Sequence, residues 1–330
     1  MKVAFFSTKS YDKEYFDRFN DIEKHQLFYF ESSLNSKTVA LAKEFDVVCL
    51  FVNDKANKEV IEQLSANGIK LIALRCAGFN NVDIEAAKEH NIKVARVPAY
   101  SPEAVAEHAV ALILTLNRKT HKAYNRIRES NFSLERLTGF NLHGKTAGVI
   151  GTGKIGQAFC RIMFGFGCKV IAYDKFPPEE MKTAGVQYLS LDEVWQQSDI
   201  ISLHCPLLPE TYHLVNKNTF AKMKRGVMLI NTSRGAVIDT ADAIDALKSG
   251  QLGYLGIDVY EQEEKLFFRD LSDTIVADEV IGRLMTFPNV LITSHQGFFT
   301  KEALEQITLV TLKNISDFEG GSALENEVIG

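Results

Sequence analysis

Short apolar runs alternate with segments of helical periodicity along most of this chain. In the first hundred residues the apolar runs are VAFFS at 3–7, VVCLFV at 47–52, KLIALR at 70–75 and KVARVP at 93–98. Helix-forming residues fill 56–67 and 83–90, and Asp83 is placed to cap the second of these segments. This alternation is typical of parallel strands joined by crossover helices. We therefore expect one small α/β unit here.

A long amphipathic helix is predicted next. Ser101 is suited to cap it, Pro102 to occupy its first position and Glu103 to face its positive end, and apolar residues continue to Leu116. This helix is expected to connect two lobes of the protein.

The strand and helix alternation begins again at Thr146. Six apolar runs follow: TAGVIG at 146–151, KVIAYD at 169–174, DIISLHC at 199–205, VMLINT at 227–232, YLGIDVY at 254–260 and NVLITSH at 289–295. Six strands in this order predict a second doubly wound parallel sheet. The charged stretch 261–288 has no strand pattern, whereas 301–318 is predicted to be helical.

Length and composition narrow the class of protein. A chain of 330 residues exceeds the size at which one core divides, so two domains are expected. The net charge of −5 and a pI near 6.0 disfavour nucleic acid as a partner. The five cysteines are widely spaced, which argues against a zinc or disulfide framework, and no metal is predicted. Neither a secretory signal nor a run of about 18 apolar residues is present, so we expect a cytoplasmic protein without membrane contact.

Gly151, Gly153 and Gly156 form a G-x-G-x-x-G motif between a predicted strand and a predicted helix. In that context the first glycine allows a tight turn, the second lets a pyrophosphate approach the backbone, and the third allows close helix packing. A purely structural glycine turn is the alternative. The motif predicts a dinucleotide-binding domain.

Asp174 ends the next apolar run, 18 residues after Gly156. A carboxylate there accepts hydrogen bonds from the adenosine ribose and repels a 2′-phosphate, which favours NAD over NADP. The alternative is that Asp174 only terminates the strand.

Three later segments place reactive side chains after predicted strands. Arg234 follows VMLI, Glu261 and Glu263 follow YLGI, and His295 follows NVLIT. Ligands of open parallel sheets bind at the carboxyl ends of the strands. A cation, a carboxylate and a histidine at one edge could bind a 2-keto acid and protonate its carbonyl. Each residue alone has a structural alternative, such as a salt bridge or a surface charge.

Seven segments resemble the D-isomer-specific 2-hydroxyacid dehydrogenase family, and within it the D-lactate dehydrogenases, over essentially the whole chain. They are RCAGFNNVD at 75–83, VPAYSPEAVAEHA at 97–109, GKTAGVIGTGKIG at 144–156, SLHCPL at 202–207, NTSRGAVID at 231–239, GIDVYEQE at 256–263 and SHQGFFT at 294–300. The resemblance implies NAD as cofactor and a small 2-hydroxy or 2-keto acid as substrate.

The resemblance also implies roles for individual residues. Arg234 would bind the substrate carboxylate and carbonyl oxygen, and His295 would transfer the proton. Glu263, rather than Glu261, would pair with His295 and favour its imidazolium form. The N–H groups of Ala77 and Gly78 would hold the carboxylate. Further cofactor contacts are implied for Lys154, Ile155, Cys205, Pro206, Thr232, Ser233 and Asp258.

The substrate pocket and the domain boundaries follow from the same resemblance. Tyr100 and Phe299 are candidates for the pocket wall, although both could be ordinary core residues. The fold implied is two Rossmann-like α/β domains, with residues 1–100 and 299–330 forming a discontinuous substrate domain and 101–298 the NAD-binding domain. A homodimer or homotetramer is implied, with the helix after Tyr100 at the contact, unless its apolar residues are buried within the subunit.

The resemblance thus implies an NADH-dependent enzyme that reduces pyruvate to D-lactate. Two alternatives remain open. One is another small D-2-hydroxyacid dehydrogenase, and the other is an NAD-sensing binding protein of the same fold.

Overall fold

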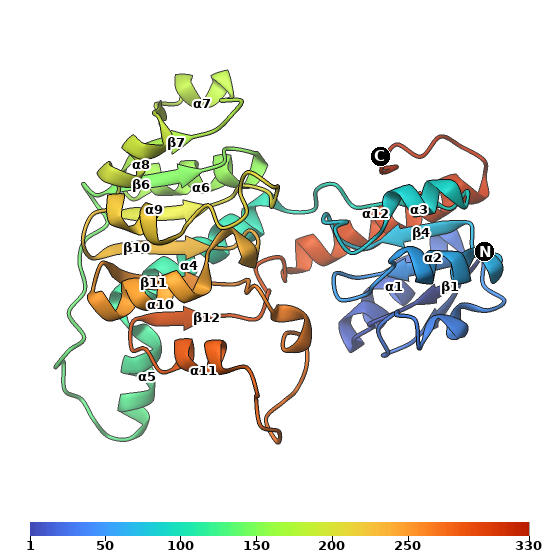
Figure 1. The fold of residues 1–330 in the computed structure, drawn as a ribbon, viewed down its shortest axis with the longest axis horizontal. Helices are drawn as coiled ribbons and strands as arrows, with labels where there is room; N and C mark the ends of the chain where they lie inside the picture. The colour runs from blue at the N-terminus through green and yellow to red at the C-terminus, as the bar shows by residue number, and fades with distance from the viewer. Residues whose placement is uncertain (330) are drawn as a thin grey trace. The chain divides into compact units, whose positions relative to one another are not determined.

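The structure, a computed structural model, describes residues 1–329 except the side chains of Ile22 and Lys265 (Figure 1). It divides into two compact units. Unit 1 comprises Met1–Ser101 together with the chain from Phe299 onward, and unit 2 comprises Pro102–Phe298. Both units are α/β, with a parallel sheet and helices on its faces.

Unit 1 contains a parallel sheet of five strands within the described residues, in the order β2-β1-β3-β4-β5. The strands are β1 (Lys2–Phe5), β2 (Gln26–Tyr29), β3 (Val47–Leu50), β4 (Leu71–Leu74) and β5 (Lys93–Ala95). This is one of the two common orders of a doubly wound sheet. β3 and β4 are buried at every position, as expected of central parallel strands covered on both faces.

Helices α1 (Ser10–Glu23) and α12 (Lys301–Glu319) pack against each other and belong to unit 1. Phe16 of α1 and Leu312 and Ile315 of α12 share a buried core with Val3 and Val47 of the sheet. The remaining helices are η1 (Val39–Ala42), α2 (Lys58–Ala66) and α3 (Ile84–Glu89). Asp83 caps α3, since its Oδ1 accepts from the Ala86 N–H at 3.0 Å. The last helix of the chain therefore completes the first sheet.

Unit 2 contains a parallel sheet of seven strands, again counted within residues 1–329, in the order β12-β11-β10-β9-β6-β7-β8. The strands are β6 (Thr146–Ile150), β7 (Lys169–Tyr173), β8 (Gln187–Tyr188), β9 (Ile200–Leu203), β10 (Val227–Asn231), β11 (Leu252–Ile257) and β12 (Val290–Ile292). The strand order reverses between β6 and β9. Such a switch point is where doubly wound sheets bind ligands, at the carboxyl ends of the strands.

Helices cover both faces of the second sheet (Figure 1). One face packs on α4 (Pro102–Arg118) and α6 (Lys154–Gly165), and the other on α8 (Leu191–Gln197), α9 (Lys217–Lys222) and α10 (Thr240–Ser249). The remaining helices are α5 (Thr120–Arg128), α7 (Glu179–Thr183), η2 (Gly235–Val237), η3 (Glu263–Lys265) and α11 (Glu279–Met285). The apolar residues of α4 are thus largely buried within unit 2.

Two strands were not predicted from the sequence. β2 has alternating exposed and half-buried residues, and β8 has two residues. Both lie at sheet edges, where one side of the strand lacks a neighbour. Edge strands need fewer apolar residues than central strands, so the apolar pattern that identified the others is weak in them. The sheet of unit 2 accordingly has seven strands where six were expected.

Within the described part of the chain, no helix is both long and apolar enough to span a membrane.

Candidate active site

The turn between β6 and α6 contains glycine at three positions that differ in their surroundings. Gly151 has a φ of +90°, and a Cβ there would lie 2.8 Å from the Cys205 backbone nitrogen. A Cβ on Gly156 would lie 2.1 Å from the carbonyl oxygen of Gly151. Gly153, the N-cap of α6, has nothing within 4 Å of the corresponding position. The first and third glycines satisfy internal packing, whereas the second leaves open space at the N-terminus of α6.

Asp174 lies beside this turn, directly after β7. Its Oδ2 accepts hydrogen bonds from the N–H and the hydroxyl of Thr152, at 2.5 and 3.0 Å. Its Oδ1 accepts from the Phe176 N–H at 2.8 Å. The Tyr188 hydroxyl donates to Thr152 Oγ1 at 2.9 Å. Thr152 and Tyr188, which sequence reasoning did not single out, therefore fix the carboxylate beside the glycine turn.

Four further predicted cofactor residues follow β9 and β10, on the side of the switch point away from β7. Cys205 is buried and Pro206 is exposed. The Ser233 hydroxyl donates to Asn231 Oδ1 at 2.8 Å. Thr232 is buried, and its Oγ1 has no hydrogen-bond partner among residues 1–329. A buried hydroxyl without a partner is costly, which is consistent with a ligand that bonds to it.

These features fit a dinucleotide. The open space at Gly153 and the N–H groups at the start of α6 suit a pyrophosphate. The Asp174 carboxylate follows β7, the second strand of unit 2 in chain order, and suits a ribose diol. Lys154 and Ile155 form the first turn of α6 and therefore lie at the same edge.

Arg234 follows β10 in a loop held by its own neighbours. Asn231 Nδ2 donates to the Arg234 carbonyl at 2.9 Å, and Arg234 Nη1 donates to the Ser233 carbonyl at 2.6 Å. The side chain is partly exposed, and it forms no ion pair with a carboxylate within residues 1–329. Most of its N–H donors thus remain available to an anionic ligand.

Gly235 explains how the Arg234 loop meets the segment after β11. A Cβ on Gly235 would lie 2.1 Å from the Tyr260 carbonyl carbon and 2.4 Å from the Glu261 nitrogen. Only glycine allows the two backbones to approach so closely. The loop that carries Arg234 is therefore packed directly against the segment that carries Glu263.

His295 and Glu263 form a direct pair. His295 Nδ1 lies 2.8 Å from Glu263 Oε1, while Glu263 Oε2 accepts from the Tyr260 N–H at 2.9 Å. The two side chains are 19% and 18% exposed, so the pair is only partly hydrated. Nε2 of His295 has no hydrogen-bond partner among residues 1–329. The carboxylate orients the ring through one nitrogen and leaves the other available for chemistry.

The backbone of His295 is held in an unusual conformation. Its φ is +51°, in the left-handed region that a residue with a side chain rarely adopts. The His295 N–H donates to the Asp258 carbonyl at 2.8 Å. The Asp258 carboxylate accepts from the N–H groups of Gln296 and Gly297 at 2.9 and 2.8 Å. Asp258 thus anchors the loop that carries the histidine.

His108 of α4 completes this anchor. Its Nε2 lies 2.9 Å from Thr293 Oγ1 and 3.3 Å from Asp258 Oδ1. Burial opposes ionisation of Asp258, but hydrogen bonds from His108 and Thr293 outweigh it and lower the pKa of Asp258 below its ordinary value. Sequence reasoning missed His108, because a histidine inside an amphipathic helix carries no signal of its own.

Glu261 is paired with a different histidine. Glu261 Oε1 lies 2.7 Å from His213 Nε2, and Glu261 Oε2 accepts from the Thr240 N–H at 3.0 Å. His204, which directly follows β9, is a poor candidate for acid–base chemistry, because desolvation lowers its pKa to about 3. Of the two glutamates in the segment after β11, the structure therefore places Glu263 against His295.

Of the predicted substrate residues of unit 1, Ala77, Gly78 and Tyr100 follow strands, whereas Phe299 precedes α12. Ala77 and Gly78 follow β4 and are partly exposed. Tyr100 follows β5, and Phe299 packs edge-on against Tyr11 with ring centroids 4.7 Å apart. Phe299 is 48% exposed.

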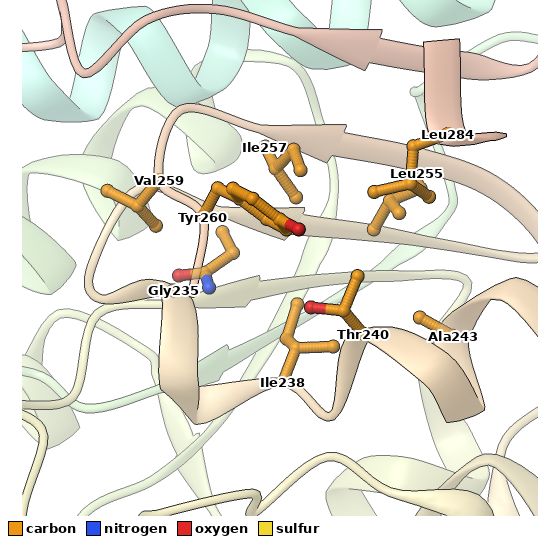
Figure 2. A pocket seen from close by; sticks show the side chains of 10 residues that line it. Gly235, Ile238, Thr240, Ala243, Leu255, Ile257, Val259, Tyr260 and Leu284 are labelled. Carbon is orange, nitrogen blue, oxygen red and sulfur yellow. The ribbon is translucent and has the colours of Figure 1, made fainter. Parts of the chain in front are cut away.

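A small cavity lies beneath the Arg234 loop in unit 2. Its volume is about 10 Å³, room for about one water molecule. Figure 2 shows the Tyr260 ring, Ile238 and Thr240 among the side chains that line it. A hollow of about 320 Å³ in unit 1, lined by α3, β5 and residues 327–329, contains none of the predicted site residues. No cluster of His, Cys, Asp or Glu within the described residues is suited to a metal ion.

Comparison with known proteins identifies the family. Residues 110–297 match the NAD-binding domain of the D-isomer specific 2-hydroxyacid dehydrogenases. The chain is 54% identical to a 2-hydroxyacid dehydrogenase homolog of Haemophilus influenzae, covering 100% of this chain and 99% of that protein. It is 53% identical to the D-lactate dehydrogenase of Escherichia coli, with 100% of both covered. The apo-structure of D-lactate dehydrogenase from Escherichia coli superposes with a TM-score of 0.92, at 51% identity and full coverage of both chains.

The predicted fold class, family and NAD cofactor are confirmed by these matches. The chain belongs to the D-isomer-specific 2-hydroxyacid dehydrogenase family and is an NAD-dependent enzyme.

Proposed function

We propose that this enzyme reduces pyruvate to D-lactate with NADH. The observation that carries the proposal is the His295–Glu263 pair, 2.8 Å apart, in the same unit as the glycine turn and Arg234. The similarity to proteins named D-lactate dehydrogenase supports the choice of keto acid. The reaction consumes pyruvate, NADH and one proton, and it yields D-lactate and NAD⁺.

Two residues of unit 2 would act on the substrate, and a third would act through one of them. Arg234 would bind the substrate carboxylate and carbonyl oxygen with its planar fork of N–H donors. His295 would donate its Nε2 proton to the carbonyl oxygen, and Glu263 would stabilise the imidazolium form. NADH, when bound beside these residues, would supply the hydride for the carbonyl carbon. In D-lactate oxidation the same histidine would accept the proton.

Residues of unit 1 would also bind the substrate. The N–H groups of Ala77 and Gly78 would hold its carboxylate, and Tyr100 and Phe299 would wall the pocket. Residues 1–100 and 299–330 would then serve as the substrate domain, and 101–298 as the cofactor domain.

The substrate is tested by following NADH oxidation with pyruvate, hydroxypyruvate, glyoxylate, 2-ketobutyrate, oxaloacetate and phenylpyruvate. We expect the highest kcat/KM for pyruvate and D-lactate as the product. One additional methylene changes binding by about 1 to 3 kcal/mol, so 2-ketobutyrate should react more weakly than pyruvate but measurably. The proposal is wrong if L-lactate is the main product or no keto acid is reduced.

Asp174 is expected to select NADH over NADPH. Its carboxylate lies at the glycine turn, where it would bond to the ribose and repel a 2′-phosphate. Asp174→Ala should narrow the ratio of kcat/KM for NADH to that for NADPH, because NADH binds less tightly and the repulsion is lost. Asp192→Ala, which removes an exposed carboxylate paired with Lys222, is the control. Equal use of both cofactors by the unmodified enzyme would contradict this role.

Two other assignments are distinguished by the same assays. Another small D-2-hydroxyacid dehydrogenase would prefer a different keto acid in the panel. An NAD-sensing binding protein would bind NADH tightly yet turn over none of the acids.

We also propose a homodimer or homotetramer in the cytoplasm. The apolar side chains of α4 are largely buried within unit 2. In contrast, α5 and the segment after it expose four apolar side chains, those of Tyr124, Ile127, Phe132 and Leu134. Such a set of exposed apolar residues is typical of a subunit contact. All five cysteines are buried thiols, as expected in a reducing compartment.

A further inference from the structure

The segment proposed to bind the substrate carboxylate is held through its carbonyl groups. The Val97 N–H donates to the Cys76 carbonyl at 3.1 Å. Arg96 Nη1 donates to the Ala77 carbonyl at 2.8 Å. The Cys76 thiol donates to the Gly78 carbonyl at 3.3 Å. Three consecutive carbonyl groups are therefore each fixed by a donor.

The N–H groups of the same peptides remain available. In a trans peptide the C=O and the N–H point in opposite directions. A donor on the Cys76 carbonyl thus sets the direction of the Ala77 N–H, and a donor on the Ala77 carbonyl sets that of the Gly78 N–H. Neither N–H donates to an acceptor within residues 1–329. Two adjacent unbonded N–H groups form a concave site suited to an anion.

The fold brings Arg96 to this segment. β4 and β5 are parallel neighbours with Ala73 opposite Ala95, so the residues that follow both strands meet at one edge. The backbone of Arg96 is fixed from the other side, because its N–H donates to the Asn326 carbonyl and its carbonyl accepts from Asn314 Nδ2. The guanidinium lies over the Phe79 ring, 5.2 Å from the centroid.

The charge of Arg96 is not neutralised by a neighbouring carboxylate. No ion pair to it occurs within the described residues, and its side chain is only partly exposed. The bond to the Ala77 carbonyl also polarises that peptide, which makes the Gly78 N–H a stronger donor. Position and charge thus both favour an anion at Ala77 and Gly78.

We propose that Arg96 is a positioning residue for the substrate carboxylate, acting through the Ala77–Gly78 peptide without touching the substrate. This inference rests on the proposed function of Ala77 and Gly78. Because the carboxylate is unchanged during hydride transfer, Arg96 should affect ground state and transition state alike. Its loss should appear in KM more than in kcat.

The test is steady-state pyruvate reduction by Arg96→Ala, Arg96→Gln and Arg96→Lys. Misplacing a binding group by about 1 Å costs up to about 100-fold, so we expect KM of Arg96→Ala to rise about 10- to 100-fold with little change in kcat. Arg96→Gln and Arg96→Lys keep an N–H donor and should recover part of the loss. Added guanidinium ion at non-denaturing concentration should lower KM of Arg96→Ala, which a purely structural defect would not allow.

Lys93→Ala is the matched control, since Lys93 is an exposed cation on β5 that pairs with Glu327 at 3.2 Å. Its KM should stay close to that of the unmodified enzyme. A KM for Arg96→Ala within twofold of the unmodified value, or a fall in kcat alone, overturns the inference. If Arg96→Ala does not fold, Arg96→Met, which keeps an apolar stem but has no N–H donor, is judged by the same criterion.

Calorimetric titration with oxamate, an unreactive isostere of pyruvate, in the presence of NADH separates this inference from the proposed function. Weaker oxamate binding by the Arg96 variants supports the positioning role of Arg96, whether or not the unmodified protein turns over pyruvate. Unchanged oxamate binding in an enzyme that reduces pyruvate overturns the role of Arg96 alone. Absence of oxamate binding to the unmodified protein overturns the anion site itself.

Discussion

His295→Ala is expected to lower kcat for pyruvate reduction by about 10²- to 10⁴-fold, the usual contribution of a general acid. Nε2 of His295 has no partner within residues 1–329, and Glu263 holds the opposite nitrogen at 2.8 Å. The dissociation constant of NADH should change little, because the loss falls on proton transfer. Stopped-flow kinetics with saturating NADH measure the effect.

His213→Ala is the matched control. His213 is also paired with a glutamate, at 2.7 Å from Glu261, and is 27% exposed compared with 19% for His295. It should keep near-normal kcat. A similar loss in both variants would show that the effect is structural, and near-normal kcat in His295→Ala would remove this residue from the reaction.

The pH profile separates the role of Glu263 from that of His295. Reduction needs imidazolium, so kcat/KM for pyruvate should fall as pH rises. D-lactate oxidation needs neutral imidazole and should fall as pH decreases. Glu263→Gln preserves shape but removes the charge that stabilises imidazolium. Its falling limb for reduction should move to lower pH.

Glu261→Gln should leave that limb in place, because Glu261 contacts His213 and Thr240 rather than His295. An unmoved limb in Glu263→Gln would contradict the proposed role of the pair.

Arg234→Gln is expected to lower kcat/KM for pyruvate by about 10²- to 10⁴-fold, since it removes two charge-assisted hydrogen bonds of about 1.5 to 3 kcal/mol each. Arg234→Lys keeps the charge but not the planar fork, so it should recover only part of the loss. The kinetics with pyruvate and NADH provide the measurement, and binding of NADH alone should be nearly unchanged.

Arg225→Gln is the control for loss of a positive charge in the same unit. Arg225 is exposed and donates to the Ser249 carbonyl at 2.8 Å. If Arg225→Gln reduces kcat/KM as strongly as Arg234→Gln, the reduction comes from the loss of a positive charge anywhere in the unit and not from the loss of a contact with the substrate.

The sequence by itself determined the α/β class, the glycine turn and the strand-end positions of Arg234, Glu263 and His295. These features are local: buried parallel strands require continuous apolar runs, and a tight turn against a backbone requires glycine. Gly151 and Gly156 illustrate this, because a Cβ at either would meet backbone atoms. The edge strands β2 and β8 were missed because half-exposed edges need little apolar sequence.

Residue pattern alone, without the family resemblance that implied the Glu263–His295 pair, did not decide which side chains meet; the tertiary structure did. Glu261 and Glu263 are two residues apart and chemically identical, yet one lies against His213 and the other against His295. His108 reaches Asp258 from a helix 150 residues earlier in the chain, and Arg96 reaches the Ala77 carbonyl from the end of the neighbouring strand. Such pairings depend on strand order and backbone direction over long sequence separations. Local propensity and spacing carry no information about them, because many partners are compatible with the same local pattern.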